Sequence, residues 1–440
     1  MTPMRQKRKK IRNLVLCFMI LLGAFRVSSA VAEEKKPVYD VITVSAAITP
    51  PIAEYILQSI EEASKARADG LVIRFDTPGG LDLSMRDIAK GILNATVPVI
   101  VYVSPAGARA ASAGVIITVS AHIAAMAPGT NIGAAHPVAI GIGGGGMDKT
   151  MMAKVENDAV AYVIGIANKR NRNEEWVEKA VRESKSIPAE EALRFKVIDF
   201  IADDLNHLLK QADGKKIVLP TGERVLKTTG AVLHEKKMGT RLEILAALSD
   251  PNIAYILFLL GLAGLYFEFA NPGVVLPGII GGISLILAFF AMQTLPVNYA
   301  GVLLILFAVA LFIAEIKVVS HGVLTIGGIV SMIMGSLLLF DSPDPALRVS
   351  LKVMIPALIV ISLFFAGVVS LVLKAQMRKR QSGREGMIGA EGEAVTDVHE
   401  MGKVFVHGEY WNAWSDRAVE KGKRVRVVAV TALKLKIEEF

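Results

Sequence analysis

The chain has 440 residues, enough for two or three domains, and 52% of them are hydrophobic. With a mean hydropathy of +0.47, this excludes an ordinary soluble protein and indicates several membrane-spanning segments. The net charge of +8 does not indicate nucleic-acid binding, because residues 1–32 hold seven basic side chains and no acid, leaving +1 for the rest. A second basic group follows the last apolar segment: Lys374, Arg378, Lys379, Arg380 and Arg384. Both groups indicate membrane topology, and no nucleic-acid partner is expected.

Residues 1–32 are typical of a secretory signal peptide. A basic start is followed by an apolar run over 14–25 and by small residues at 30–32, directly before Glu33. The alternative is an uncleaved N-terminal anchor. The only cysteine, Cys17, lies in the apolar run, so we expect neither a disulfide nor thiol chemistry in the mature chain.

Residues 33–235 have the pattern of an α/β domain. Apolar, β-branched runs of strand length alternate with amphipathic helical stretches. The predicted strands are 38–44, 70–75 and 98–103, and the predicted helices are 51–65 and 83–94. Strands that alternate with helices of this length predict a largely parallel sheet with crossover helices.

Two short motifs in this domain suggest nucleophilic catalysis. Residues 110–114 read Ala-Ala-Ser-Ala-Gly, and a predicted apolar helix over 113–120 places Ser112 at its N-terminus. Backbone N–H groups at a helix N-terminus stabilise developing negative charge, so the N–H of Ala113 is a candidate oxyanion donor. Gly79 and Gly80 follow a predicted strand in a tight turn without side chains. Their N–H groups are the other candidate donors.

A serine hydroxyl needs a base close to it. We expect Lys154, at the start of a predicted helix over 154–168, to fill this role, because burial in an apolar site favours the neutral amine. Lys149 is the rival base. His122 lies ten residues beyond Ser112, about 15 Å along a helix, and His136 is expected to make a structural contact, although it stays open as a base. This chemistry requires no cofactor and no metal.

From residue 250 to 375 the chain has the composition of a membrane domain. Five apolar stretches, each close to the about 20 residues that cross a bilayer, occupy 252–269, 274–293, 298–316, 322–340 and 353–373. With an exported α/β domain, five crossings place the C-terminus in the cytoplasm, and the basic group after the fifth stretch agrees.

The tail, 386–440, has the pattern of a small β domain. Short alternating runs predict strands at 394–397, 402–406, 423–430 and 433–437, which favours a five-stranded, OB-like β-barrel. Trp411 and Trp414 are candidates for a binding surface or for the barrel core.

Several of these motifs together resemble the NfeD family of membrane-bound, ClpP-class serine proteases. The resemblance rests on residues 48–50, 76–81 (Asp-Thr-Pro-Gly-Gly-Leu), 111–114, 127–134, 267–273 and 408–415. In that family the serine of the Ala-Ser-Ala-Gly motif is the nucleophile, and a lysine about forty residues later is the base. Lys154 lies 42 residues after Ser112, so it matches that role better than Lys149.

The resemblance implies a ClpP/crotonase-like fold for residues 33–235, followed by a multi-span helical membrane domain and an OB-fold barrel. It also implies apolar polypeptide substrates and a stomatin- or prohibitin-like membrane protein as partner. We expect an integral protein of a bacterial cell membrane in contact with lipid, a homodimer or larger oligomer, with its protease domain extracytoplasmic and its C-terminal domain cytoplasmic.

Two other functions compete with this interpretation. One is a non-catalytic membrane scaffold for stomatin- or flotillin-like proteins; the other is a signal-peptide-fragment hydrolase resembling signal peptide peptidase A. Arg109, three residues before the candidate nucleophile, stands where a small residue is expected. We expect it to face solvent; in the cleft it would alter substrate preference.

Overall fold

The computed structural model describes residues 12–17, 19, 36–138, 149–270, 273, 275–318, 320, 322–340, 342, 347–377 and 384–440. Most of the expected signal peptide lies outside these residues, as do Asn271 and Pro272 of the 267–273 motif. The chain divides into two compact units, Met1–Leu306 with Ile333–Ala357 and Phe307–Met332 with Leu358–Phe440.

The N-terminal region is built on a six-stranded sheet with the order β11-β1-β2-β3-β5-β8. All neighbouring strands are parallel, as the alternation of strands and helices predicts. Its strands are β1 (Val38–Ser45), β2 (Gly70–Asp76), β3 (Val99–Val103), β5 (Ile123–Met126), β8 (Phe200–Ile201) and β11 (Val232–Glu235). The three predicted strands correspond to β1, β2 and β3 and are confirmed to within one residue at their ends.

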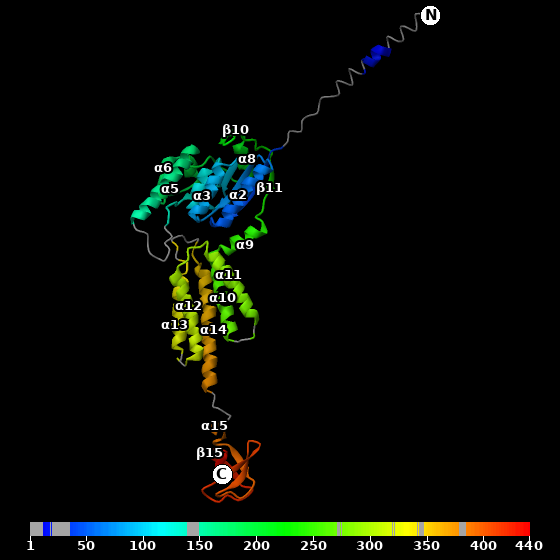
Figure 1. Cartoon of the computed structure of the whole chain (residues 1–440). Helices are drawn as coiled ribbons and strands as arrows, with labels where there is room; N and C mark the ends of the chain where they lie inside the picture. Colours follow the sequence, from blue (N-terminus) through cyan, green and yellow to red (C-terminus); the bar gives the residue numbers. More distant parts are fainter. Residues whose placement is uncertain are drawn as a thin grey trace, which may run out of the picture. The chain divides into compact units, whose positions relative to one another are not determined.

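Helices cover both faces of this sheet. On one face, α2 (Pro50–Lys65) and α3 (Asp82–Leu93) lie side by side (Figure 1). They bury a core that includes Ile42, Ile73 and Val101 of the strands. The opposite face, with Val41, Val72 and Ile100, packs against α8 (Leu205–Ala212). Because successive residues of a strand point to opposite faces, continuous apolar runs fit a sheet that is buried on both sides.

The N-terminal region also contains a small second sheet, a hairpin and further helices. A three-stranded sheet has the order β4-β6-β7, and β9 pairs with β10 as a hairpin. These elements are β4 (Arg109–Ala111), α4 (Ala113–Ser120), β6 (Asn131–Gly133), α5 (Lys149–Lys169), α6 (Glu174–Arg182), β7 (Ser186–Pro188), α7 (Ala189–Arg194), β9 (Lys216–Leu219), β10 (Gly222–Val225) and α9 (Thr240–Leu248).

Five apolar helices follow, in the region where five spans were expected. They are α10 (Pro251–Ala270), α11 (Val275–Met292), α12 (Tyr299–Lys317), α13 (Val323–Leu338) and α14 (Leu351–Met377). Over the described residues, α10 and α11 are long and apolar enough to cross a membrane, whereas the apolar parts of the other three are shorter.

The C-terminal region is a closed five-stranded barrel with the order β12-β13-β14-β16-β15, preceded by the short helix α15 (Arg384–Met387). Its strands are β12 (Glu391–Ala394), β13 (Gly402–Val406), β14 (Glu409–Trp414), β15 (Arg424–Thr431) and β16 (Lys434–Glu439). The five-stranded barrel was expected, but two strands differ. The first strand ends at Ala394, where it was predicted to begin, and β14, which carries both tryptophans, was not predicted.

Candidate active site

The glycine turn after β2 is fixed by contact with the segment that follows β1. The Ile48 N–H donates to the Gly79 carbonyl at 2.7 Å, and the Leu81 N–H donates to the Ile48 carbonyl at 2.8 Å. Gly80 has φ +151°, and a Cβ at this position would lie 2.3 Å from the Ile48 carbonyl oxygen. Only glycine fits such a close approach between two backbones.

The two glycines differ in the availability of their N–H groups. The Gly79 N–H donates to Thr77 Oγ1 at 3.2 Å. For the Gly80 N–H, no acceptor is found among the described residues. Gly80 therefore has the free donor that an oxyanion site needs, while the Gly79 donor is already engaged.

Ser112 occupies a sharp turn between β4 and α4. Its backbone has φ 52° and ψ −116°, close to the first central position of a type II′ turn, which normally takes glycine. A non-glycine residue in such a conformation costs on the order of 1–3 kcal/mol, and residues of this kind cluster at functional sites. The Ser112 N–H is held by the Gly133 carbonyl at 3.0 Å, so the side chain is presented at the start of α4.

Helix α4 is buried over its whole length. Gly114 lies against Thr77, because a Cβ on Gly114 would be 2.7 Å from Thr77 Cγ2. Thr77 in turn joins β4 through two backbone bonds, from its N–H to the Arg109 carbonyl and from the Ala111 N–H to its carbonyl. The glycine turn and the serine turn are thus packed against one another.

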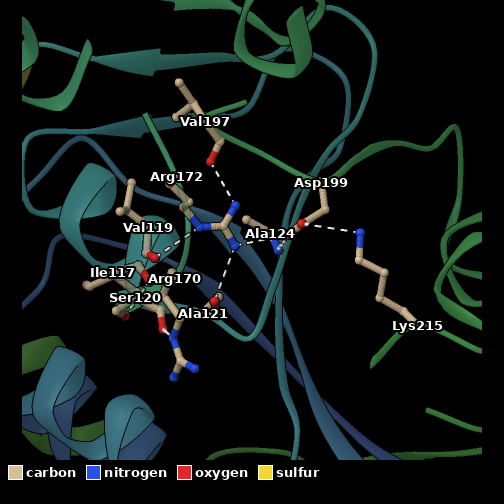
Figure 2. Close-up of polar contacts among 10 residues, drawn as sticks. All are labelled: Ile117, Val119, Ser120, Ala121, Ala124, Arg170, Arg172, Val197, Asp199 and Lys215. Carbon is tan, nitrogen blue, oxygen red and sulfur yellow. Dashed lines mark hydrogen bonds and ion pairs between the residues drawn. The ribbon is translucent and has the colours of Figure 1, made fainter. Parts of the chain in front are cut away.

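Two arginines bind the carbonyls at the other end of α4 (Figure 2). Arg172 donates to the carbonyls of Val119 and Ala121 at 3.1 and 3.2 Å, and Arg170 donates to that of Ser120 at 2.8 Å. Carbonyls at a helix C-terminus lack intrahelical partners, and cations there are favourable. The helix that starts at Ser112 is therefore fixed at both ends.

Lys154 lies in the sixth position of the described part of α5, so the prediction that its helix begins at Lys154 is wrong: the helix is already present at Lys149. Its side chain is exposed, as are most of those around it. Two ion pairs hold this half of α5, from Arg86 to Asp158 at 2.6 Å and from Arg182 to Glu156 at 3.0 Å.

One cavity of about 510 Å³ brings four of the five predicted site residues together: Ser112, Lys154, Gly80 and Ala113 all line it. Gly79 and the rival base Lys149 do not. Most of the remaining lining is apolar, with side chains such as Met85, Ile116, Val155, Tyr162 and Val181. A serine, an amine and two backbone donors around one apolar cavity can carry out acyl transfer.

Neither histidine lines this cavity. His122 is buried, accepts from the Val99 N–H at 3.2 Å and lies 3.2 Å from Arg170 Nη2. Burial, together with the Arg170 charge, lowers the pKa of His122 to about 3. His136 Nδ1 is 2.9 Å from the Val181 carbonyl oxygen, the structural contact that was expected.

Arg109 is exposed, and its backbone N–H donates to Asp76 Oδ1 at 3.0 Å; among the described residues its side chain has no hydrogen-bond or ion-pair partner. It does not line the cavity. The residues that sequence reasoning missed are Arg86, Asp158 and Arg172. Asp158 follows Lys154 by one helical turn, a spacing that could have been noticed; the arginines come from other elements, and no local signal marks them.

Family profiles and known proteins identify the same relatives for this chain. Residues 38–217 match the NfeD1b N-terminal domain, residues 252–372 the NfeD integral membrane domain, and residues 384–439 the NfeD-like C-terminal, partner-binding domain. The chain is 34% identical to the membrane-bound protease PH1510 of Pyrococcus horikoshii, over 97% of each chain. It is 27% identical to the membrane protein NfeD1b of Bacillus subtilis, over 96% of this chain and 97% of that one.

A solved structure of the membrane-bound, stomatin-specific protease 1510-N, a lysine-to-alanine mutant in complex with a substrate peptide, is 31% identical. It covers 48% of this chain and 97% of that one, with a TM-score of 0.45. The expected classes of fold are confirmed: an α/β domain, a helical membrane domain and a five-stranded β-barrel. The protein is membrane-bound and is a homologue of a membrane-bound serine protease. The expected resemblance is therefore correct, and the chain belongs to the NfeD family.

Proposed function

We propose that the chain is a membrane-anchored serine endopeptidase that cleaves apolar segments of membrane-associated polypeptides with a dyad of Ser112 and Lys154. The observation that supports this most directly is the shared cavity, which is lined by Ser112, Lys154 and the two residues whose N–H groups are the candidate oxyanion donors, Gly80 and Ala113. The sequence relationship to PH1510, described as a membrane-bound protease, points the same way.

In this mechanism the Ser112 Oγ attacks the scissile carbonyl carbon while neutral Lys154 accepts its proton. The carbonyl oxygen becomes an oxyanion that the N–H groups of Gly80 and Ala113 bind; loss of one such donor typically costs about 3–4 kcal/mol of transition-state stabilisation. Lys154 then donates the proton to the leaving amine, and the C–N bond breaks. Water, activated by the same amine, hydrolyses the acyl-serine and restores the enzyme.

The lining of the cavity indicates the class of substrate. Its apolar side chains come from α3, α4, α5 and α6 and from segments between elements, and they offer burial to apolar residues of a peptide. A bound apolar peptide would also cover Lys154, which is exposed in the unliganded chain, and removal of water favours the neutral amine that the mechanism needs.

The wider assignment follows the family. We propose a ClpP-like protease domain over 33–235, a membrane domain over 250–375 and an OB-fold domain over 386–440, after a signal peptide at 1–32. Protease 1510-N is described as specific for a stomatin homolog, and the profile that matches 384–439 is described as partner-binding. We propose a stomatin-like partner, a homodimer or larger oligomer, an extracytoplasmic protease domain and a cytoplasmic barrel.

The test compares three variants of the full chain in detergent: Ser112→Ala, Lys154→Ala and Lys149→Ala. Cleavage of an apolar fluorogenic peptide should fall by at least about a thousandfold in the first two, by analogy with serine protease knockouts, and stay near wild type in the third. Undiminished cleavage by Ser112→Ala would refute the proposal. Loss in Lys149→Ala with retention in Lys154→Ala would reassign the base.

A serine-directed fluorophosphonate distinguishes the enzyme from a scaffold. Wild type should be labelled at Ser112, and Ser112→Ala should not. A folded wild-type chain that takes up no label and cleaves no peptide would favour the scaffold interpretation, in which the α/β domain is a docking module.

A further inference from the structure

A second cavity of about 510 Å³ lies on the α/β domain, at the end of α4 opposite to Ser112. Its walls come from the turn after α5, the segment between α7 and β8, and strand β9. Six cationic side chains line it: Lys169, Arg170, Arg172, Lys196, Lys215 and Lys216. Apart from these and the neutral His122, only Asp199 among the lining residues can carry a charge.

This single carboxylate is already engaged (Figure 2). Asp199 accepts from Arg172 Nη2 at 3.0 Å and from the Ala124 N–H at 2.9 Å, and its other oxygen lies 3.9 Å from Lys215 Nζ. Lys169, Lys196 and Lys216 have no ion-pair partner among the described residues. The cavity therefore holds an excess of positive charge over its own acids.

Burial strengthens this imbalance. Arg170 donates to backbone carbonyls, not to a carboxylate, and desolvation together with the nearby Arg172 charge lowers its pKa to about 10. The same cations contribute to the low pKa of His122 on the cavity wall. Charges act more strongly where water is partly excluded, so an anion that enters this cavity relieves repulsion among its cations.

The lining also indicates the kind of anion. Among the described lining residues there is no phenylalanine, tyrosine or tryptophan on which a nucleobase could stack, and the apolar members are small aliphatic groups such as Ile198 and Val218. The ring of His122 is already engaged by the Val99 N–H and by Arg170. The arginine forks are occupied by carbonyls and by Asp199, which leaves lysine amines as the free groups. Lysine binds phosphate as a compact point charge without demanding planar geometry.

We propose that this cavity binds a phosphate-type oxyanion of two or more negative charges, independently of the catalytic site. The contacts are made by Lys169, Lys196 and Lys216, which are exposed, around the positive floor that Arg170 and Arg172 provide. Because these arginines also hold the last carbonyls of α4, the bound anion lies at the far end of the helix that begins with Ser112.

The probe is inorganic tripolyphosphate, titrated calorimetrically into the full chain in neutral detergent at low salt. The Ser112→Ala background keeps the result independent of any peptidase activity. The double variant Lys169→Gln/Lys216→Gln removes two cavity lysines. The matched control, Lys210→Gln/Lys227→Gln, removes two exposed lysines that do not line the cavity.

We expect saturable binding whose Kd rises about tenfold in the cavity variant, as loss of two partly exposed charge pairs predicts, and less than twofold in the control. Equal weakening in both variants would overturn the proposal by showing diffuse charge attraction, as would the absence of saturable binding. Tighter binding of ATP than of tripolyphosphate would overturn it as well, since a base would then be recognised.

Nanodiscs separate the two sources of phosphate. Tripolyphosphate binding that persists equally in neutral and in cardiolipin-containing nanodiscs assigns the cavity to a soluble polyphosphate. Binding that is lost only in the cardiolipin nanodiscs, whose lipid carries two phosphates, assigns it to a lipid headgroup. Either result, with the lysine dependence above, supports the oxyanion site.

Discussion

The two halves of the candidate active site are built in opposite ways. On the nucleophile side, α4 is entirely buried, its first turn packs against Thr77, and two arginines bind its last carbonyls. On the base side, the first described turns of α5 are mostly exposed and are held by ion pairs on the surface.

This contrast distinguishes the part of the site that is rigid before substrate binds from the part that can move. Surface ion pairs contribute about 0–1 kcal/mol each, whereas breaking a buried one by removing a partner typically costs about 3–5 kcal/mol. The serine turn and the Gly80 donor are therefore preorganised, and Lys154 can shift at small energetic cost. The following variants test this asymmetry, from the largest expected effect on folding to the smallest.

Arg172→Met should be the most damaging. It removes the guanidinium that binds Asp199 and the carbonyls of Val119 and Ala121, so we expect a loss of about 3–5 kcal/mol in the free energy of unfolding of the α/β domain. Faster hydrogen exchange of the α4 amides measures it. Arg194→Met, at a side chain that is 66% exposed, is the control. Equal losses of stability in the two variants would show that Arg172 does not anchor α4.

Gly114→Ala should disturb the nucleophile directly. The new methyl group would lie 2.7 Å from Thr77 Cγ2, and such overpacking typically costs about 1–3 kcal/mol. Thermal unfolding should report the loss, and labelling of Ser112 by fluorophosphonate should slow. Gly165→Ala in α5, where nothing lies within 4 Å of the added Cβ, should not be destabilising. A neutral Gly114→Ala would mean that Thr77 moves freely.

His122 should make the stability of the nucleophile side depend on pH. Its folded pKa of about 3 lies below the ordinary 6.5, so the unfolded chain binds the proton first. Stability is then complete above pH 6.5 and falls as the pH decreases toward 3. Between pH 7.5 and 5 the loss from this group is about 2 kcal/mol. In urea titrations at several pH values, His122→Gln should show a weaker dependence of the free energy of unfolding on pH than wild type. The same pH dependence in both proteins would contradict the buried neutral state of His122.

Asp158→Asn should have the smallest effect on folding and a visible one on activity. Asp158 is 67% exposed in its pair with Arg86, so we expect less than about 1 kcal/mol of destabilisation. Peptide cleavage should fall several-fold through kcat, because α5 loses a contact that orients Lys154. Glu175→Gln, in the exposed pair with Lys179, is the matched control. Unchanged kcat would show that Lys154 needs no such support.

The parts of the fold that local patterns encode were predictable. Strands β1, β2 and β3 follow from apolar β-branched runs, and the turns at Gly80 and Ser112 follow from short motifs. The start of α5 was placed too late, because the segment 149–153, Lys-Thr-Met-Met-Ala, is too short to show an amphipathic pattern by itself. Strand β14 was missed because its tryptophans were considered only as a binding surface or as core aromatics and no strand was assigned to them, although Ala413 in its middle is buried in the barrel.

The anchors of the site were not predictable in the same way. Arg172 lies 51 residues from Ala121, and Arg86 lies 72 residues from Asp158. Contacts of this separation depend on how the helices pack, and arginine alone gives no sign of its partner. The sequence could indicate candidates for the reacting residues, but not the residues that hold those candidates in place.

The exposure of Lys154 bears on the activity of such an enzyme when no substrate is bound. If Lys154 is the base, its exposure leaves the site incomplete until an apolar peptide covers both the serine and the amine. The unliganded chain would then be inactive in the way a zymogen is, but without a prosegment, since the bound substrate itself shields the site from water. Well-folded proteins with polar surfaces would not be cleaved, because they cannot cover the site. Substrate specificity would then be set by the same binding step that activates the enzyme.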